Sequence, residues 1–354
     1  MADLWFAILA GMFTGFAILA GWDFGAGALG GIIARTPDER REVIRAIGPL
    51  WTWNEVWLIA SGGLTMCLFP AALGTAFSAF YLGLHMVLWC LLLRGISLEF
   101  RTHLDDPLWR SFWDGVFPLA NLLLVLLFGV AFGGLVRGLP LSGDPGEASC
   151  DMPLFTSFAP YGAVGVLDWY TVLVGIFTVI ILLAHGAAFL ALHAGWEVGR
   201  RAQWWARRLF PVALALLAVV TVATWSVRPD FAAALGKPVC WGAAVVAVAG
   251  ASAITVGLLR GRHGITLGGS TLVLAGLLAG AFCAMHPELI HSTLGEGRSL
   301  TVANTVVPVH GLYLAMVWWP FAAGLSVAVY LLNRRWHGPG RTGGAGPGRT
   351  GGAA

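Results

Sequence analysis

The side chains of this sequence best suited to chemistry are four acids in or beside long apolar segments: Asp23, Glu55, Glu99 and Asp114. A charged side chain at the centre of a membrane costs about 2.5–3.5 kcal/mol on insertion scales, so each acid must face other helices, lie near an interface or carry a proton. Burial and neighbouring like charges both favour the protonated carboxyl, which suits a cluster of acids to proton uptake. The alternative is structural: each acid pairs with an arginine at a helix end, the candidate partners being Arg94, Arg101 and Arg110.

Glu55 lies in the least ordinary stretch of the chain, which reads WTWNEVWLIASGGLTMCLFP from Trp51 to Pro70. Tryptophans at positions 51, 53 and 57 fit a belt at the membrane interface, where an indole ring is buried while its N–H stays hydrated. The stretch therefore fits either an aromatic anchor with an acid that reaches toward water, or a site of proton transfer. Asp23 has small neighbours in GWDFGAG, which would let another helix pack closely against it.

Membrane-spanning helices must position these acids. Of the 354 residues, 58% are hydrophobic and 11% are charged, whereas soluble domains carry about 25% charged residues. Segments of about 20 apolar residues cross a bilayer. The sequence predicts an all-α polytopic protein with nine spans: Leu4–Ile33, Trp53–Phe69, Leu73–Leu93, Val116–Val136, Tyr170–Leu192, Leu209–Val227, Val239–Leu259, Ile265–Met285 and Val307–Leu332. The first span exceeds signal-peptide length and lacks a basic start, so we expect it to be retained.

The spans divide into two four-helix bundles plus one extra helix. Residues 1–136 form the first bundle with the carboxylates, 137–165 an extracytoplasmic connecting loop, and 166–333 the second bundle with the ninth helix. Leu92–Gly95 recurs as Leu258–Gly261, a short match that suggests the same division. Residues 334–354 are mainly Gly, Arg and Pro and are predicted to be a disordered cytoplasmic tail.

Basic residues predict the orientation of the chain. Sixteen of the 21 Lys and Arg follow odd-numbered spans, whereas four follow even-numbered spans and Arg94 ends the third. Because basic loops stay in the cytoplasm, the N-terminus is predicted to be extracytoplasmic and the C-terminus cytoplasmic. All four acids then lie at the cytoplasmic end of one bundle. The net charge of +3 reflects this topology, and no soluble basic surface indicates nucleic-acid binding.

Histidines and cysteines suggest weaker alternatives. Histidines in or at the start of spans could ligate haem, but His85 and His185 are expected at different depths, so hydrogen-bonded core histidines are favoured over haem ligation; His310 is the third such residue. A metal site at His286, Glu288 and His291 is the alternative to a solvated loop. The five cysteines contain no CxxC pair and are interpreted as small buried residues without a function.

Several ordered motifs resemble a known family. GWDFGAGAL, RTPDERREVIRAIGPLW, NEVWLIASGG, FSAFYLGLHMVLWCLLLRGISLEFR and LWRSFWDGVF, within about the first 135 residues, are similar to subunit II of the cytochrome bd-type ubiquinol oxidases. LAHGAAFLALHAG in the fifth span resembles the equivalent family helix. Asp23 matches the acid of the family's GFD-x-G motif, and Asp114 matches the acid after WRxxWD. Trp51, Asn54 and Trp57 match W-D-G-N-x-V-W, while Arg94 lies within a further matched segment.

The resemblance implies a heterodimeric respiratory complex in the bacterial inner membrane that oxidises quinol and reduces oxygen to water. Two haems b and one haem d are then expected in the partner, subunit I, with no haem or metal ligand on this chain. This chain would stabilise subunit I and conduct protons from the cytoplasm, without a catalytic residue of its own. Small accessory transmembrane subunits, membrane lipid or quinone are further partners to expect.

Two departures from the family pattern affect the proton route. Ala20 replaces a common aspartate three residues before Asp23, while Thr52 and Trp53 replace the aspartate and glycine after Trp51. Our hypothesis is that Glu55, one helical turn further in, replaces the aspartate missing at position 52. Two other functions remain open: a secondary membrane transporter or proton-coupled carrier, and a structural partner whose proton route has been lost.

Overall fold

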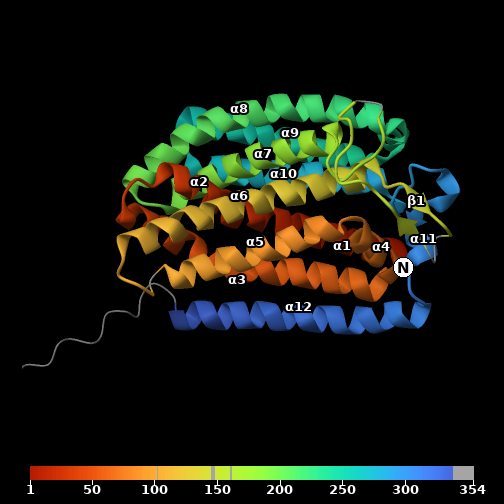
Figure 1. The fold of residues 1–354 in the computed structure, drawn as a ribbon, viewed down its shortest axis with the longest axis horizontal. Helices are drawn as coiled ribbons and strands as arrows, with labels where there is room; N and C mark the ends of the chain where they lie inside the picture. Colours follow the sequence, from red (N-terminus) through yellow and green to blue (C-terminus); the bar gives the residue numbers. More distant parts are fainter. Residues whose placement is uncertain (102, 145–147, 160–161, 338–354) are drawn as a thin grey trace, which may run out of the picture. The chain divides into compact units, whose positions relative to one another are not determined.

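The computed structural model describes residues 1–101, 103–144, 148–159 and 162–337, which are almost entirely helical (Figure 1). The helices are α1 (Ala2–Ala20), η1 (Gly21–Gly25), α2 (Ala26–Ile33), α3 (Pro37–Leu68), α4 (Pro70–Ala79), α5 (Tyr81–Phe100), α6 (Pro107–Arg137), α7 (Trp169–His193), α8 (Trp196–Val227), η2 (Pro229–Gly236), α9 (Pro238–Arg260), α10 (His263–Met285), η3 (Glu296–Arg298), α11 (Val302–Thr305) and α12 (Val309–His337). Two small antiparallel hairpins pair β1 (Leu141–Ser142) with β2 (Ser149–Cys150), and β3 (Glu288–Ile290) with β4 (Leu300–Thr301).

The predicted all-α membrane class is confirmed. Within the described residues, seven helical segments are long and apolar enough to cross a membrane, or eight if the bent pair α3 and α4 makes one span. The nine spans and the two-bundle arrangement stay predictions. Residues 1–306 pack as one compact unit, and residues 307–337 belong to a second; most of the predicted tail, 334–354, lies outside the described residues.

Several helices begin well before the predicted spans because their polar first turns are capped. The Thr36 hydroxyl accepts from the Glu39 amide and the Glu39 carboxylate accepts from the Thr36 amide, a capping box that starts α3 before the arginine-rich segment. Asp106 caps α6 through the Trp109 amide. Helix α8 contains the predicted span Leu209–Val227 but begins earlier, at Trp196, without a side-chain cap, and it carries its arginines on helical turns.

The predicted third span, Leu73–Leu93, was also wrong. Pro70 begins the separate helix α4, whose axis is bent by 120° from that of α3, and α5 begins only at Tyr81. The repeated Leu-Leu-Arg-Gly motif does not mark equivalent places either. Arg94 lies inside α5, whereas Arg260 ends α9 and Gly261 terminates it in a left-handed conformation with φ of +64°.

Helix α7 lies within the core of the larger unit, between α6 and α8 (Figure 1). Small residues bring it against η1, because a Cβ on Gly186 would lie 2.3 Å from the Ala26 backbone nitrogen and a Cβ on Gly25 would lie 2.2 Å from the Leu182 carbonyl oxygen. Both glycines therefore permit a backbone-to-backbone contact that no larger residue allows. This contact fixes the helical segment that carries Asp23.

The interpretation of all five cysteines as small buried residues without a function was wrong. Cys240, in the first turn of α9, forms a disulfide with Cys283 near the end of α10. The two residues are 43 positions apart, and only the antiparallel pairing of α9 with α10 brings them together. Cys67, Cys90 and Cys150 are free thiols.

Candidate proton-transfer site

Asp23 lies in a wide helical turn at the centre of the first candidate site. Residues Gly21–Gly25 adopt a π-helix between α1 and α2, a departure from α geometry that is frequent at functional sites. The Asp23 side chain is fully buried. It accepts a hydrogen bond from Nδ2 of Asn54 on α3 at 3.1 Å and forms an ion pair with Arg94 on α5. Three separate segments thus meet at one carboxylate.

Arg94 links this carboxylate to Glu55. Its side chain is completely buried, one terminal nitrogen pairing with Asp23 and the other lying 3.3 Å from Oε1 of Glu55. The guanidinium carbon also lies 4.8 Å from the centre of the Phe24 ring, within cation–π range. A single buried positive charge therefore faces two acids, and the group carries one excess negative charge when both are ionised.

Glu55 connects the buried pair with the surface of the chain. Its side chain is 34% exposed, and the indole N–H of Trp51, one turn earlier on α3, donates to it at 2.6 Å. Thr52, at the position of the missing aspartate, is exposed and shares this side of the helix with Glu55. Glu55 is thus the acid of this group that an incoming proton would reach first.

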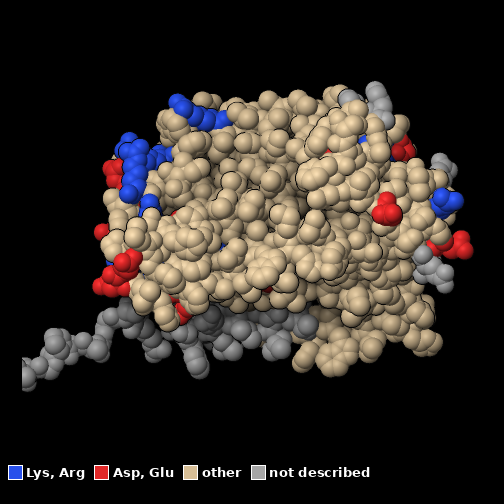
Figure 2. Space-filling view, in the orientation of Figure 1, with Lys and Arg blue, Asp and Glu red and all other residues tan. Residues whose placement is uncertain are grey.

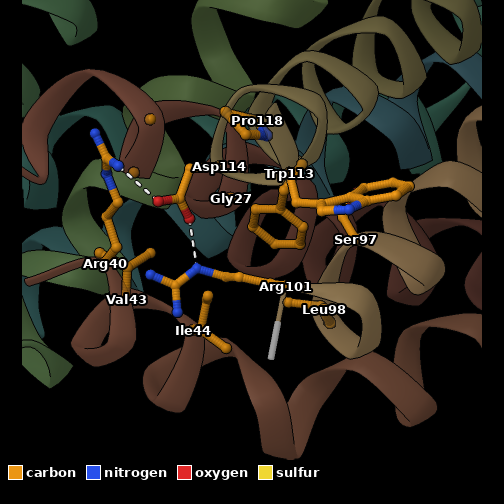
Figure 3. A pocket seen from close by; sticks show the side chains of 13 residues that line it. Gly27, Arg40, Val43, Ile44, Ser97, Leu98, Arg101, Trp113, Asp114 and Pro118 are labelled. Atoms are coloured by element: carbon orange, nitrogen blue, oxygen red, sulfur yellow. Dashed lines mark hydrogen bonds and ion pairs between the residues drawn. The ribbon is translucent and has the colours of Figure 1, made fainter. Parts of the chain in front are cut away.

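A second site lies around Asp114 (Figure 3). Arg40 on α3 and Arg101 at the end of α5 both form ion pairs with the Asp114 carboxylate, Arg40 at 2.6 Å. The three side chains line a pocket. Its wall also includes Gly27, Gly30 and Gly31 of α2, Ser97 and Leu98 of α5, and Trp113, Phe117 and Pro118 of α6.

The pocket lies one helical turn from the buried ion pair. Gly27 follows Asp23 by four residues along η1 and α2, and Ser97 follows Arg94 by three along α5, so each pair shares a face of its segment. The structure thus places the predicted acids in two neighbouring groups, Asp23 with Glu55 and Asp114 with its arginines. Glu99 is exposed near the end of α5 and is not among the residues that line the pocket.

Ion pairing is more extensive than the proton-uptake interpretation assumed. Arg94 and Arg101 pair with acids as the structural alternative predicted, whereas Arg110 pairs with Asp105 instead of with one of the four candidate acids. Arg40 was missed by the sequence reasoning. It belongs to the arginine-rich segment after the first span, and only its ion pair with Asp114 on α6 distinguishes it from its neighbours.

The tryptophans near Glu55 do not form a simple interfacial belt. Trp51 binds Glu55, and the ring of Trp57 packs over Gly15 of α1, where an added Cβ would lie 3.2 Å from Cζ3. Trp53 is partly buried. At least two of the three indoles therefore have specific partners inside the chain.

The histidines occupy unrelated surroundings. His185 is fully buried on α7, with Nδ1 at 2.6 Å from the Ser270 hydroxyl and its ring beside Gly21, where an added Cβ would lie 2.4 Å from Cδ2. His85 is exposed on α5, and its Nδ1 lies 2.9 Å from the Tyr81 carbonyl oxygen. His310 is exposed in the second unit. His85 and His185 thus have separate partners, Tyr81 on α5 and Ser270 on α10.

A third acidic group lies in the loops that follow α8 and α10. Asp230, Glu288 and His291 offer ligand atoms within 4.8 Å of one another, so they are the set closest to a metal site among the described residues. Arg228, however, donates to both carboxylates, at 2.6 Å to Asp230 and 3.1 Å to Glu288. His286 contacts Asp3 instead. A guanidinium between the acids favours an ion-pair network at this position.

These features define a polytopic helical membrane protein with buried acid–arginine pairs at one end of its first helices. The sequence model of the cytochrome bd terminal oxidase subunit II family matches residues 1–333, and the chain belongs to that family. It is 29% identical over 338 residues to "Cytochrome bd ubiquinol oxidase subunit 2" of Bacillus subtilis, a match covering 94% of this chain and 96% of the relative.

Further comparisons agree with this assignment. "Cytochrome bd-I ubiquinol oxidase subunit 2" of Escherichia coli is 29% identical over 198 residues, which cover 56% of this chain and 50% of that protein. A chain of the bd oxidase from Geobacillus thermodenitrificans has the same fold, with a TM-score of 0.73 and 18% identity over 95% of this chain and 98% of that one. The transporter alternative is not favoured by these matches.

Proposed function

We propose that this chain is subunit II of a bd-type respiratory quinol oxidase in the bacterial inner membrane. The family match over residues 1–333 carries the assignment, and the membrane-spanning helices agree with it. In this function the chain forms a complex with the haem-bearing subunit I and stabilises it. The two haems b, the haem d and the reduction of oxygen to water are assigned to that partner in this proposal.

The chain's own chemical contribution is proton transfer toward the partner. Glu55 is partly exposed and receives a hydrogen bond from Trp51, so it can exchange a proton at the surface of the chain. Arg94 lies between Glu55 and Asp23, and a proton added at Glu55 removes the excess negative charge of this group. Asp114 and the pocket beside it supply a polar entrance one turn away on α5.

The orientation that this function requires has the N-terminus extracytoplasmic and the C-terminus cytoplasmic. Two observations support it. The arginines of the α8 start and of the α9–α10 turn lie at the same end of their helices, joined by the hydrogen bond from Arg207 to the Leu258 carbonyl, as a single cytoplasmic side requires. The Cys240–Cys283 disulfide joins the start of α9 to the end of α10, at the side away from the α9–α10 turn and its arginines. Disulfides persist in the oxidising compartment outside the cytoplasm.

A reduced-minus-oxidised visible spectrum of the complex purified through a tag on this chain tests the main assignment. We expect bands of haems b and d together with oxygen consumption on added quinol. A haem-free preparation, under conditions where the complex stays assembled, would refute the assignment to the oxidase.

The proton route requires a separate test with Glu55→Gln, which keeps the shape and removes the charge. We expect quinol-dependent proton uptake in vesicles to fall at least tenfold with the haem spectrum unchanged, as for loss of a group that transfers protons. Glu197→Gln, on the exposed first turn of α8, is the matched control and should leave uptake unchanged. Equal uptake in wild type and Glu55→Gln would leave the chain a structural partner whose route has been lost.

A further inference from the structure

Arginines and tryptophans gather where α8 begins and α9 ends, outside the proton-transfer site. In Figure 2 Lys and Arg atoms cluster at the left-hand end of the view, over the start of α8. Arg207 and Arg208 are exposed on α8, and Arg260 and Arg262 are exposed at the α9–α10 turn. Arg207 donates to the Leu258 carbonyl at 3.3 Å, which joins the two groups into one surface.

This surface, defined by Arg207, Arg208, Arg260 and Arg262, holds an excess of positive charge. Within the described ranges, none of the four guanidinium groups has an acidic partner. The nearby acid Glu197 is paired with Arg200, and Glu39 with Arg201. The four arginines therefore retain donors for an anion from outside the chain.

The same surface combines these charges with aromatic and apolar groups. The guanidinium of Arg208 lies 3.4 Å from the centre of the Trp204 ring, which is itself 46% exposed. Leu259, beside Arg260, is 81% exposed, and Val212, one turn beyond Arg208, is 48% exposed. Tryptophan favours the headgroup level of a membrane, and exposed apolar side chains beyond it face acyl chains.

We propose that this surface binds a membrane lipid with an anionic phosphate headgroup, such as phosphatidylglycerol. The arginines hold the phosphate, Trp204 lies at the headgroup level, and the acyl chains follow the exposed apolar side chains of α8 and α9. Lipid is the occupant because both helices cross the membrane next to this surface, and because charge and depth match a lipid and not a soluble anion.

Native mass spectrometry of the purified complex tests the proposal. Wild type, given equal phosphatidylglycerol and phosphatidylcholine, should retain phosphatidylglycerol preferentially. The double variant Arg207→Gln/Arg208→Gln should bind it roughly tenfold more weakly, because each arginine near an anionic headgroup contributes to the attraction. Arg45→Gln/Arg110→Gln makes the same charge change at the same end of the helices and should leave the preference unchanged.

Three outcomes would overturn the proposal: no preference in wild type, an equal loss in the control variant, or competition by inorganic phosphate at millimolar concentration. The last would assign the surface to a free anion. If the double variant does not assemble, wild type alone still decides, since its preference for phosphatidylglycerol must fall as salt is raised. None of these measurements depends on oxidase turnover.

Discussion

At the scale of single residues, Arg94 decides how the buried charges are balanced. It is the only arginine among the described residues that pairs with both Asp23 and Glu55. Its replacement by Gln leaves the Asp23 carboxylate buried without a counter-charge, which costs about 3–5 kcal/mol. We expect Arg94→Gln to lower the thermal unfolding temperature of the complex strongly, or to prevent its assembly.

Arg94→Lys is the informative companion variant. A lysine keeps the charge but offers a point donor where the guanidinium reaches two acids at once, so it should restore stability only in part. Differential scanning fluorimetry on both variants provides the comparison. Wild-type stability in Arg94→Gln would show that Asp23 is protonated in the resting protein.

The loop acids give a prediction about pH. The Arg228 guanidinium lowers the pKa of Asp230 below its ordinary value. Burial alone would raise the pKa of Glu288, but His291 and Arg228 outweigh it and lower that pKa as well. An acid whose pKa is lower in the folded than in the unfolded protein stabilises the folded state at pH values above its ordinary pKa of about 4. This stabilisation is lost as the pH falls through the pKa of the folded protein.

Thermal unfolding of wild type should therefore be insensitive to these acids between neutral pH and about pH 5, and should weaken below about pH 4. Asp230 is 52% exposed, so solvent screens its pair and the contribution is modest. Arg228→Gln should lose about 1–2 kcal/mol at neutral pH and show a flatter acid dependence. An unchanged pH profile in that variant would contradict the assigned cause.

At the scale of elements, the contact between η1 and α7 positions Asp23. Gly186 packs directly on the backbone of Gly25 and Ala26, so Gly186→Ala forces α7 away from the π-helical turn. Overpacking of this kind costs about 1–3 kcal/mol. We expect lower stability together with reduced proton uptake, because Asp23 moves with its turn.

Gly11→Ala provides the control for that measurement. Apart from the neighbouring backbone of its own helix, no atom lies within 4 Å of the Cβ that it would add, so stability and uptake should both stay at wild-type values. If Gly186→Ala changed stability and left uptake intact, the position of Asp23 would not matter for transfer.

At the scale of the whole molecule, the Cys240–Cys283 disulfide tests the orientation of the chain. The proposed topology places it outside the cytoplasm, where it stays oxidised. When intact cells are acid-quenched, denatured and alkylated without reductant, peptides with Cys240 and Cys283 should remain unlabelled and cross-linked. Cys67 and Cys90, which are free, should be labelled in the same sample. Labelling of Cys240 and Cys283 before reduction would place their end of the helices in the cytoplasm.

The sequence alone determined the class of the protein and its family motifs. Hydropathy and charge are properties of local composition, so the polytopic helical fold could be predicted from the sequence. The same properties selected Asp23, Glu55 and Asp114 as candidate residues for proton transfer. Local patterns were weaker at boundaries. Neither the break at Phe80 nor the start of α8 at Trp196 has a side-chain cap, so no local capping signal marks these two boundaries.

The tertiary structure alone decided which charges meet. Arg94 reaches Asp23 across 71 residues, Arg40 reaches Asp114 across 74, and Cys240 joins Cys283 across 43. The π-helical turn at Asp23 likewise accompanies the close approach of α7 at Gly186. Such pairings depend on how the helices pack. Many arginines are chemically identical, and the one that pairs with a given acid is the one that packing brings close to it, a distance that sequence periodicity does not encode.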